Sequence, residues 1–398
     1  MADSIVLVLN SGSSSLKFSL FDLGKQQELM NGLADRLGQN DDEAALSWKF
    51  EGVKDKQTIA GADQAKALET LLQLLENKGF ASRLSAVGHR VVHGGEYFYD
   101  SVLVDDLVLD KIKRCNDLAP LHNPANVLGI EQMQKLFPGL PQIAVFDTAF
   151  HQTMPKEAYL YALPYELYRE HGVRRYGFHG TSHKYVAQQA VKQLGLNPSQ
   201  HGIVTAHLGN GCSATSVLNG HSIDTTMGMT PLEGLVMGTR SGDLDPSLHQ
   251  FLAQRLNIGI DEITDMLNKK SGLLGVSELS NDMRSLCDAA EEGNEQAELA
   301  VQLFCYRLAK SICALAMPLG KLDALVFTGG IGENAVRVRE LTLNNLKILG
   351  FELDTEQNGK HGSDNNGVIT SDSSTCAVVI ATAEEWAIAQ DTARLIGE

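Results

Sequence analysis

The chain has 398 residues, of which 43% are apolar and 21% charged, and a formal net charge of -16. This composition predicts a globular protein of two or three domains and argues against nucleic acid or an anionic membrane as a partner. Six cysteines without a CxxC pair indicate neither a zinc site nor a disulfide framework. We expect a soluble, cytoplasmic protein, because no basic, apolar leader is recognised and apolar runs such as 312–319, which Pro318 interrupts, fall short of a membrane span.

Hydrophobic periodicity predicts strands and helices that follow one another along the chain. The expected strands are 5–10, 16–22, 85–92, 142–147, 202–208, 214–218, 323–328 and 376–382. The expected helices are 64–77, 106–117, 125–136, 182–194, 246–255, 295–317, 335–346 and 383–395. This alternation is typical of α/β proteins.

One pattern occurs twice. The segments IVLVLNSGSSSLKFSLFD (5–22) and IVTAHLGNGCSATSVLNG (203–220) each place a turn of glycine and small hydroxyl residues between two apolar strands. Two copies about half a chain apart predict two related domains. The amides of each turn could bind a phosphate. For either turn alone an ordinary glycine-rich hairpin is an equally good interpretation, and the pair together favours phosphate binding.

The known phosphate-binding motifs do not account for these turns. A P-loop needs Gly-Lys followed by Ser or Thr, but the Gly-Lys pairs at 24, 320 and 359 are followed by Gln, Leu and His. Gly209 and Gly211 resemble the start of a dinucleotide fingerprint, yet a strand is expected after them, where the fingerprint needs a helix. A third glycine turn, 329–333, follows an apolar strand and opens a helix. It is either an ordinary strand-to-helix turn or a nucleotide contact.

Several further segments stand in order along the chain. They are LNSGSSSLK (9–17), GHRVVHGG (88–95), PLHNP (120–124), FDTAFH (146–151), YGFHGTSH (176–183), HLGNG (207–211) and the turn at 329–333. In kind and order they resemble the motifs of the acetate kinase family, and the match runs from Asn10 to Glu384. The family usually has Thr-Asn-Glu-Glu where this chain has Thr-Ala-Glu-Glu at 382–385, which puts a helix cap and a contact near the metal in doubt.

The resemblance implies a fold and an assembly. The fold is α/β, with two duplicated actin-like, ribonuclease H-like ATPase domains closing over a nucleotide cleft, and the assembly is a homodimer. It also implies Mg²⁺, or Mn²⁺ in its place, held by Asn10 and Glu384 together with ATP or ADP. Because one ion would join both ends of the chain, we expect one domain over 1–148 plus 384–398 and the other over 149–383.

The implied reaction is the reversible transfer of a phosphoryl group from ATP to acetate, which gives acetyl phosphate and ADP by direct in-line transfer. Such a transfer requires positive charge around two anions. Arg90 lies at a strand end beside histidines and glycines, and Arg240 in a glycine-rich loop, so neither context favours a surface role. The resemblance places Arg90 on the acetate carboxylate, Arg240 on the phosphoryl group and His179 in a hydrogen bond to it.

Asp147 is also implied to be catalytic. Because acetate is already ionised at neutral pH, no general base is needed, and we expect Asp147 to orient an arginine or a magnesium-bound water. The alternative is a strand-end aspartate that caps a turn. His183, four residues after His179, could bind a metal with it, but a core or capping role is the sounder interpretation.

The remaining implied contacts are with nucleotide and acid. Lys17 would reach a phosphate. The other nucleotide-binding residues would be His207, Leu208, Gly209, Asn210, Gly211, Asp282, Met283, Arg284, Gly329, Gly330, Ile331, Gly332 and Glu333. Val92 lies two residues beyond Arg90 on the expected strand and so on the same side. With Leu121, Phe178 and Pro231 it would enclose the methyl group of acetate.

Three alternatives remain open. A kinase of propionate or another short-chain acid would share every motif. A nucleotide-gated chaperone or filament ATPase of the same superfamily would lack a small-acid pocket. A sugar kinase would need many hydrogen-bonding residues around hydroxyls and a catalytic base. A coupled assay for acetyl phosphate with an acid-free control separates these classes.

Overall fold

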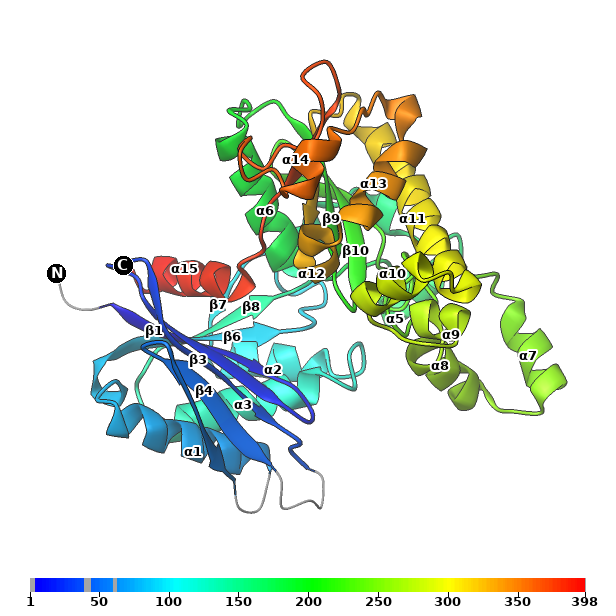
Figure 1. The fold of residues 1–398 in the computed structure, drawn as a ribbon. Helices are drawn as coiled ribbons and strands as arrows, with labels where there is room; N and C mark the ends of the chain where they lie inside the picture. Colours follow the sequence, from blue (N-terminus) through cyan, green and yellow to red (C-terminus); the bar gives the residue numbers. More distant parts are fainter. Residues whose placement is uncertain (1–3, 39–43, 60–62, 398) are drawn as a thin grey trace. The chain divides into compact units, whose positions relative to one another are not determined.

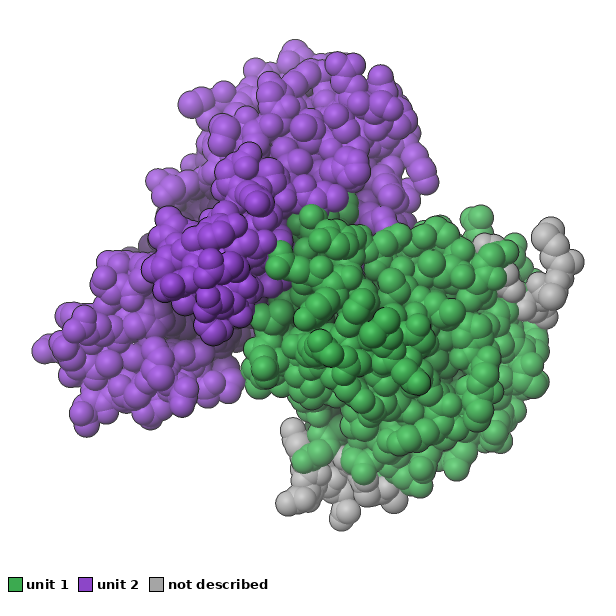
Figure 2. Space-filling model, turned by 180° about the vertical axis from the view of Figure 1, so that it is seen from behind, with its two compact units in different colours: residues 1–152, 383–398 green, residues 153–382 purple. Residues whose placement is uncertain are grey.

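The computed structural model describes residues 4–38, 44–59 and 63–397. The chain forms two compact units, each with its own sheet. Unit 1 comprises residues 1–152 and 383–398, and unit 2 comprises residues 153–382 (Figure 2).

The sheet of unit 1 combines an antiparallel half with a parallel half. Its strands are β1 Ile5–Ser11, β2 Leu16–Asp22, β3 Gln27–Asp35, β4 Ala45–Phe50, β5 Val53–Thr58, β6 Leu84–Val91, β7 Val102–Leu103 and β8 Gln142–Phe146. Their order in the sheet is β5-β4-β3-β2-β1-β6-β8-β7. The strands from β1 to β5 pair antiparallel, whereas β1 with β6 and β6 with β8 pair in parallel.

Helices cover both faces of this sheet. They are α1 Gln64–Asn77, α2 Asp106–Arg114, α3 Asn123–Leu136 and α15 Glu384–Ile396 (Figure 1). Alternation along β1 assigns the faces, because successive side chains point to opposite sides of a strand. Leu7 packs in a core with Leu71 of α1, whereas Val6 and Val8 pack with Ile388 of α15. The last segment of the chain therefore completes the core of the first unit.

Unit 2 repeats the central part of this topology. Its strands are β9 Gly202–Leu208, β10 Cys212–Leu218, β11 His221–Thr225, β12 Ala324–Thr328 and β13 Cys376–Val379. They are ordered β11-β10-β9-β12-β13, with antiparallel pairs on the β10 side of β9 and parallel pairs on the β12 side. The strands β3-β2-β1-β6-β8 have the same order and directions. The predicted duplication and α/β class are thus confirmed, and the two repeated glycine turns are the β1–β2 and β9–β10 hairpins.

The helices of unit 2 pack against its sheet or against one another (Figure 1). They are α4 Lys156–Tyr159, α5 Tyr165–His171, α6 Gly180–Gln193, α7 Leu248–Leu256, α8 Ile260–Lys269, α9 Gly272–Ser277, α10 Met283–Glu291, α11 Glu295–Ala316, α12 Gly329–Asn334, α13 Val336–Asn345 and α14 Thr355–Gly359. Short 3₁₀ helices also occur in both units. They are Ala81–Arg83 in unit 1, Ala149–Thr153 at the boundary between the units, and Met317–Leu319 and Lys347–Leu349 in unit 2.

One expectation about apolar length was wrong. The helical run Glu295–Leu319 has 25 residues and contains an 18-residue window with a mean hydropathy of 1.4, which is long and apolar enough, by length and composition alone, to cross a membrane. The run continues through Pro318, because a proline is tolerated in the first turn of the 3₁₀ segment. Phe304 and Leu308 of α11 are 1% exposed, and the helix packs against α9, α10 and α13. These contacts are those of a core helix of unit 2.

Candidate active site

Arg90 and Asp147 form a two-pronged ion pair in unit 1. Nε of Arg90 donates to Oδ1 of Asp147 at 3.0 Å, and Nη2 donates to Oδ2 at 2.6 Å. The two residues come from adjacent parallel strands, since Arg90 is near the end of β6 and Asp147 directly follows β8. Asp147 is 1% exposed. This geometry fixes the plane of the guanidinium while Nη1 reaches Oδ1 of Asn10 at 3.3 Å.

Carboxylates crowd the same end of unit 1. The pKa of Glu384 is raised to about 7, mainly by burial and also by the neighbouring charges of Asp147 and Glu385, against the opposing charges of Arg90 and Lys17. Nζ of Lys17 pairs with Glu385. A carboxyl group whose pKa is raised in this way has too little positive charge nearby to stabilise its ionised form.

The donor set at this end of unit 1 suits a magnesium ion. The amide oxygen of Asn10 and the carboxylate of Glu384 are hard oxygen ligands, and a divalent cation would supply the positive charge that Glu384 lacks. Within residues 4–38, 44–59 and 63–397, no group of three or more His, Cys, Asp or Glu side chains is arranged to hold a metal. The site therefore fits an ion that is bound largely by water and phosphate, as Mg²⁺ usually is.

In unit 2, His179 and Arg240 meet at the turn between β9 and β10. A Cβ at Gly211 would lie 3.1 Å from Nη2 of Arg240 and 3.6 Å from Nε2 of His179. A side chain at this position would therefore crowd Arg240, and a nitrogen atom of each of the two residues borders it. Nη1 of Arg240 donates to the carbonyl of Pro231 at 2.7 Å, and in the described part of the chain no carboxylate pairs with this guanidinium. Burial lowers the pKa of Arg240, which an anion beside it would reverse.

The loop that carries Arg240 packs directly on this turn. The amide of Gly238 donates to the carbonyl of Asn210 at 3.0 Å, and a Cβ at Gly238 would lie 1.9 Å from Oδ1 of Asn210. Only a residue without a side chain allows so close an approach. The close packing of Gly238 against the side chain of Asn210 therefore accounts for the glycine at position 238.

Three histidines line the same region. The rings of His179 and His207 stack with centroids 4.4 Å apart. His183 is fully buried, and its Nδ1 and Nε2 lie 2.7 Å from Oγ1 of Thr205 and from Oγ of Ser213. The core interpretation of His183 is confirmed by this burial, because hydroxyl groups occupy both of its ring nitrogens.

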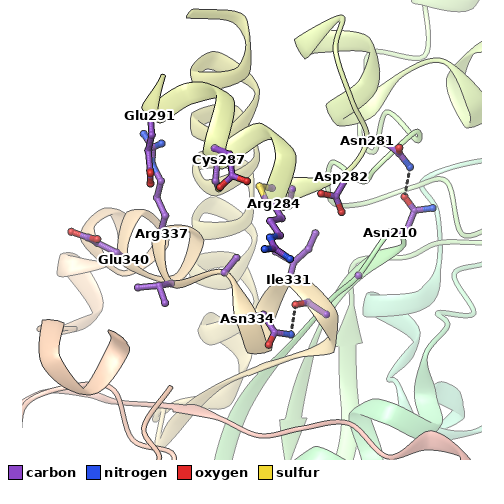
Figure 3. A pocket seen from close by; sticks show the side chains of 16 residues that line it. Asn210, Asn281, Asp282, Arg284, Cys287, Glu291, Ile331, Asn334, Arg337 and Glu340 are labelled. Carbon is purple, nitrogen blue, oxygen red and sulfur yellow. Dashed lines mark hydrogen bonds between the residues drawn. The ribbon is translucent and has the colours of Figure 1, made fainter. Parts of the chain in front are cut away.

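A cavity of about 1240 Å³ opens beside the turn. Its wall includes seven of the predicted nucleotide-binding residues, namely Gly209, Asn210, Asp282, Met283, Arg284, Gly330 and Ile331. Figure 3 shows Arg284 of α10 and Ile331 of α12 pointing into the same space. Nδ2 of Asn281 donates to Oδ1 of Asn210 at 3.1 Å, and Nδ2 of Asn334 donates to the carbonyl of Gly330 at 2.9 Å (Figure 3).

The other predicted nucleotide residues stand outside the cavity wall. The wall does not include His207, Leu208, Gly211, Gly329, Gly332 or Glu333. Leu208 is a fully buried core residue of β9. Oε1 of Glu333 accepts from the amides of Gly329 and Thr382 at 2.9 and 3.0 Å, so its carboxylate holds the glycine turn in shape. Asp282 lines the cavity, but its Oδ1 also accepts from the amide of Ser285 and caps α10.

Further cavity residues were missed from the sequence. They are Asn281, Cys287, Asp288, Glu291, Asn334, Ala335, Val336, Arg337 and Glu340. One signal was available, because Arg284, Cys287, Asp288 and Glu291 recur at the spacing of one helix face. No helix was predicted over 283–291, so the shared face was not recognised.

The residues proposed to enclose a methyl group differ in exposure. Val92 is 8% and Phe178 3% exposed, whereas Leu121 is 71% exposed. Val92 and Leu121 belong to unit 1, and Phe178 and Pro231 to unit 2. The strand β6 ends at Val91, so Val92 lies just outside it, where its amide donates to Oδ1 of Asn126 at 3.0 Å. Strand alternation therefore does not apply to Val92 and no longer predicts that its side chain lies on the same side of β6 as that of Arg90.

The residue before Glu384 leaves α15 without a side-chain cap. Ala383 occupies the N-cap position with φ -141° and ψ 64° and offers no oxygen to the first helical amides. The doubt that the sequence raised about this cap is therefore confirmed.

Comparisons with known proteins extend over the full chain. The profile of the Acetokinase family matches residues 5–390. Acetate kinases from Shewanella amazonensis and Shewanella woodyi are 52% and 51% identical, and each comparison covers 100% of both chains.

Comparison with solved structures agrees with the match to the Acetokinase family. A propionate kinase from Francisella tularensis subsp. tularensis is 48% identical with a TM-score of 0.93, over 98% of this chain and 100% of that one. An acetate kinase from Porphyromonas gingivalis is 42% identical with a TM-score of 0.92, over 98% of this chain and 99% of that one. The profile match, the half-identical relatives and the shared fold show that the chain belongs to the acetokinase family, whose members are phosphotransferases with a carboxyl group as acceptor.

Proposed function

We propose that this chain transfers the γ-phosphoryl group of ATP to acetate, in line and reversibly, to give acetyl phosphate and ADP. The observation that carries the proposal is the position of Arg240 and His179, which border Gly211 on the turn that continues into the 1240 Å³ cavity. A nucleotide in this cavity would extend its phosphates along the turn. Arg240 would then neutralise the equatorial oxygens of the transferring group, and Nε2 of His179 would donate a hydrogen bond to one of them.

Arg90 is proposed to bind the acetate carboxylate. Its two bonds to Asp147 support this role, because a guanidinium held in one plane presents its remaining N–H groups in a fixed direction. Acetate is ionised at neutral pH, so Asp147 has no proton to remove from it. Asp147 is thus proposed to orient Arg90 and to keep it charged at a partly buried position.

Asn10 and Glu384 are proposed to hold a Mg²⁺ ion that ATP brings with it. When bound, the ion would neutralise charge that develops on the β- and γ-phosphate oxygens. Lys17 is proposed to contact a phosphate, for which it would leave Glu385. Arg284, Ile331 and the backbone of Gly330 are proposed to face the adenosine.

Propionate is the second candidate acceptor. The 48% identity to a propionate kinase favours it, since this value is close to the 50% identity to an acetate kinase of the Shewanella genus. Val92, Leu121, Phe178 and Pro231 are proposed to contact the alkyl group, and their side chains would decide between the two acids.

A cytoplasmic homodimer is proposed as the working form. Six free cysteines support the compartment. Exposed apolar side chains on α7, α8 and α11 support the dimer, because an interface would remove their apolar surface from water. These side chains are Phe251, Leu256, Ile260, Leu299 and Tyr306. Light scattering should give about twice the chain mass of 43.1 kDa. A measured mass equal to that of one chain would refute the dimer.

One assay tests the proposed reaction. Purified protein with ATP and Mg²⁺ is given acetate, propionate, butyrate or no acid, and acyl phosphate is trapped as the hydroxamate. Acetyl phosphate formed above the acid-free control supports the proposal. ATP hydrolysis at one rate with and without acid would instead indicate a chaperone-like or filament ATPase, and a higher specificity constant for propionate would replace acetate as the substrate.

A further inference from the structure

A chain of hydrogen bonds runs behind His179 into the core of unit 2. Nδ1 of His179 lies 2.8 Å from Oγ of Ser213, and the same oxygen lies 2.7 Å from Nε2 of His183. Nδ1 of His183 lies 2.7 Å from Oγ1 of Thr205. Thr205, His183 and Ser213 are fully buried. These four residues, from Thr205 to His179, are called the relay below.

If all four groups are neutral, their protons must all point in the same direction along the relay. A hydroxyl has one proton to donate, and a neutral imidazole donates through one nitrogen and accepts through the other. If Thr205 donates to His183, then His183 donates to Ser213, Ser213 donates to Nδ1 of His179, and His179 carries its proton on Nε2. If every bond is reversed, His179 carries its proton on Nδ1 and Nε2 becomes an acceptor.

The position of Thr205 decides between the two directions. In the first direction its hydroxyl proton lies in the 2.7 Å bond to His183. In the reversed direction that proton is left with the carbonyl of Thr215, 3.5 Å away and at the outer limit of a hydrogen bond. A buried donor without a good partner is destabilising, whereas a carbonyl with a spare lone pair is tolerated more easily. The first direction is therefore the more stable one.

The surroundings of His179 make this choice matter. Its Nε2 is the nitrogen that borders Gly211, beside Nη2 of Arg240. The positive charge of Arg240 opposes a second positive charge on His179, and the other rings nearby are those of His183 and His207. A neutral His179 has only one N–H group, so it can donate to a ligand at Gly211 only if that proton is on Nε2.

We propose that Ser213, His183 and Thr205 are positioning residues that hold neutral His179 in the tautomer protonated on Nε2, ready to donate to the transferring phosphoryl group. The role of the tautomer rests on the proposed function, whereas the tautomer itself follows from the relay alone. His207 repeats the arrangement on a smaller scale. Its Nδ1 lies 2.8 Å from Oγ of Ser182, which lies 2.9 Å from Oγ1 of Thr382.

Nitrogen NMR and kinetics on matched variants test the relay. Thr205→Val keeps the shape of the side chain and removes its hydroxyl, whereas Thr205→Ser keeps the hydroxyl. Ser213→Ala breaks the relay at its centre. Ser216→Ala is the control. It removes a buried hydroxyl on the same strand as Ser213, and this hydroxyl donates to the carbonyl of Leu315 at 2.8 Å instead of contacting a histidine. Two-bond ¹H–¹⁵N spectra of histidine-labelled full-length protein show which ring nitrogen is protonated, and His179→Gln assigns the signal.

The expected wild-type signal is the tautomer protonated on Nε2. Thr205→Val and Ser213→Ala should shift it toward Nδ1 and lower kcat about 10- to 100-fold, as is typical for residues that orient a reacting group, with little change in KM. Thr205→Ser and Ser216→Ala should keep both the signal and kcat. A wild-type His179 protonated on Nδ1, or an unchanged signal and kcat in both Thr205→Val and Ser213→Ala, would overturn the relay. A wild type that forms no acyl phosphate would overturn the proposed function and leave the tautomer measurable.

Discussion

Protonation of His89 should set the acid limit of stability in unit 1. His89 lies on β6 between β1 and β8, is 2% exposed and has Nε2 2.7 Å from Oε1 of Gln142. Burial lowers the pKa of His89 from 6.5 to about 4, although the bond to Gln142 works in the opposite direction. Between these values the unfolded chain binds a proton at His89 and the folded unit does not. The free energy of unfolding therefore falls as the pH drops through this interval.

The size of the effect follows from the interval. A pKa difference of one unit corresponds to about 1.4 kcal/mol, so the interval from 6.5 to about 4 is worth about 3 kcal/mol once the pH is below 4. At pH 5 the unfolded group is almost fully protonated and the folded group almost neutral. His89 alone should then lower the stability of unit 1 by about 2 kcal/mol relative to pH 7.5.

Urea unfolding at pH 7.5 and pH 5 measures this loss. The two tryptophans, Trp48 and Trp386, both lie in unit 1, so their fluorescence reports its unfolding. His89→Gln keeps an amide donor for Gln142 and has no titrating group, so its loss between the two pH values should be about 2 kcal/mol smaller than that of the wild type. His221→Gln, at an exposed position, is the control. Equal losses in the wild type and His89→Gln would refute the reasoning.

Four further substitutions have defined outcomes. Arg240→Ala should lower kcat by about 10³- to 10⁵-fold without unfolding the protein, and Arg90→Ala should in addition raise KM for acetate; near-native turnover in either folded variant would remove that arginine from the mechanism. Val92→Ala should raise the specificity constant for propionate relative to acetate, within the roughly 10- to 200-fold that one methylene can provide; if Val92 only packs, unfolding will show a loss of about 1 to 3 kcal/mol and the ratio will not move. Ala383→Asn should add a cap to α15 and stabilise unit 1 by about 0.5 to 2 kcal/mol, and an unchanged melting temperature would mean that the backbone at this position does not admit the capping bond.

Elements with a strong apolar period were predictable to within a few residues. Gln64–Asn77 and Gly202–Leu208 match the predicted ranges at both ends. Some of the missed elements lack such a period, whereas α8 has one, with Ile260, Ile263 and Leu267 at helical spacing, that was not recognised. All six residues of β5, Val53–Thr58, are exposed, so no side of this strand is marked by apolar residues. In α10 only Met283 and Leu286 are buried, and its other face is polar because it lines the cavity.

The site was predictable only as far as single motifs carry their chemistry. The contexts of Arg90 and Arg240 indicated buried cations, but the pairing of Arg90 with Asp147 joins residues 57 positions apart and needs the sheet order. The same holds for Ser213, which looks like any serine of an apolar strand and bonds histidines 30 and 34 positions away. Contacts of this kind depend on register and on side-chain direction, neither of which a motif specifies.

The return of the chain to unit 1 also sets an order for biosynthesis. A nascent chain that has been made only as far as residue 382 contains all of unit 2 but lacks α15, whose Ile388 and Ala389 cover Val6 and Val8 of β1. Until α15 has been made, that apolar face of the sheet stays open to solvent or to a chaperone. Glu384 is the first residue of α15, so a chain that stops before this helix also lacks one of the two proposed metal ligands. Premature termination or trimming near the C-terminus should therefore leave an aggregation-prone protein rather than a partly active one.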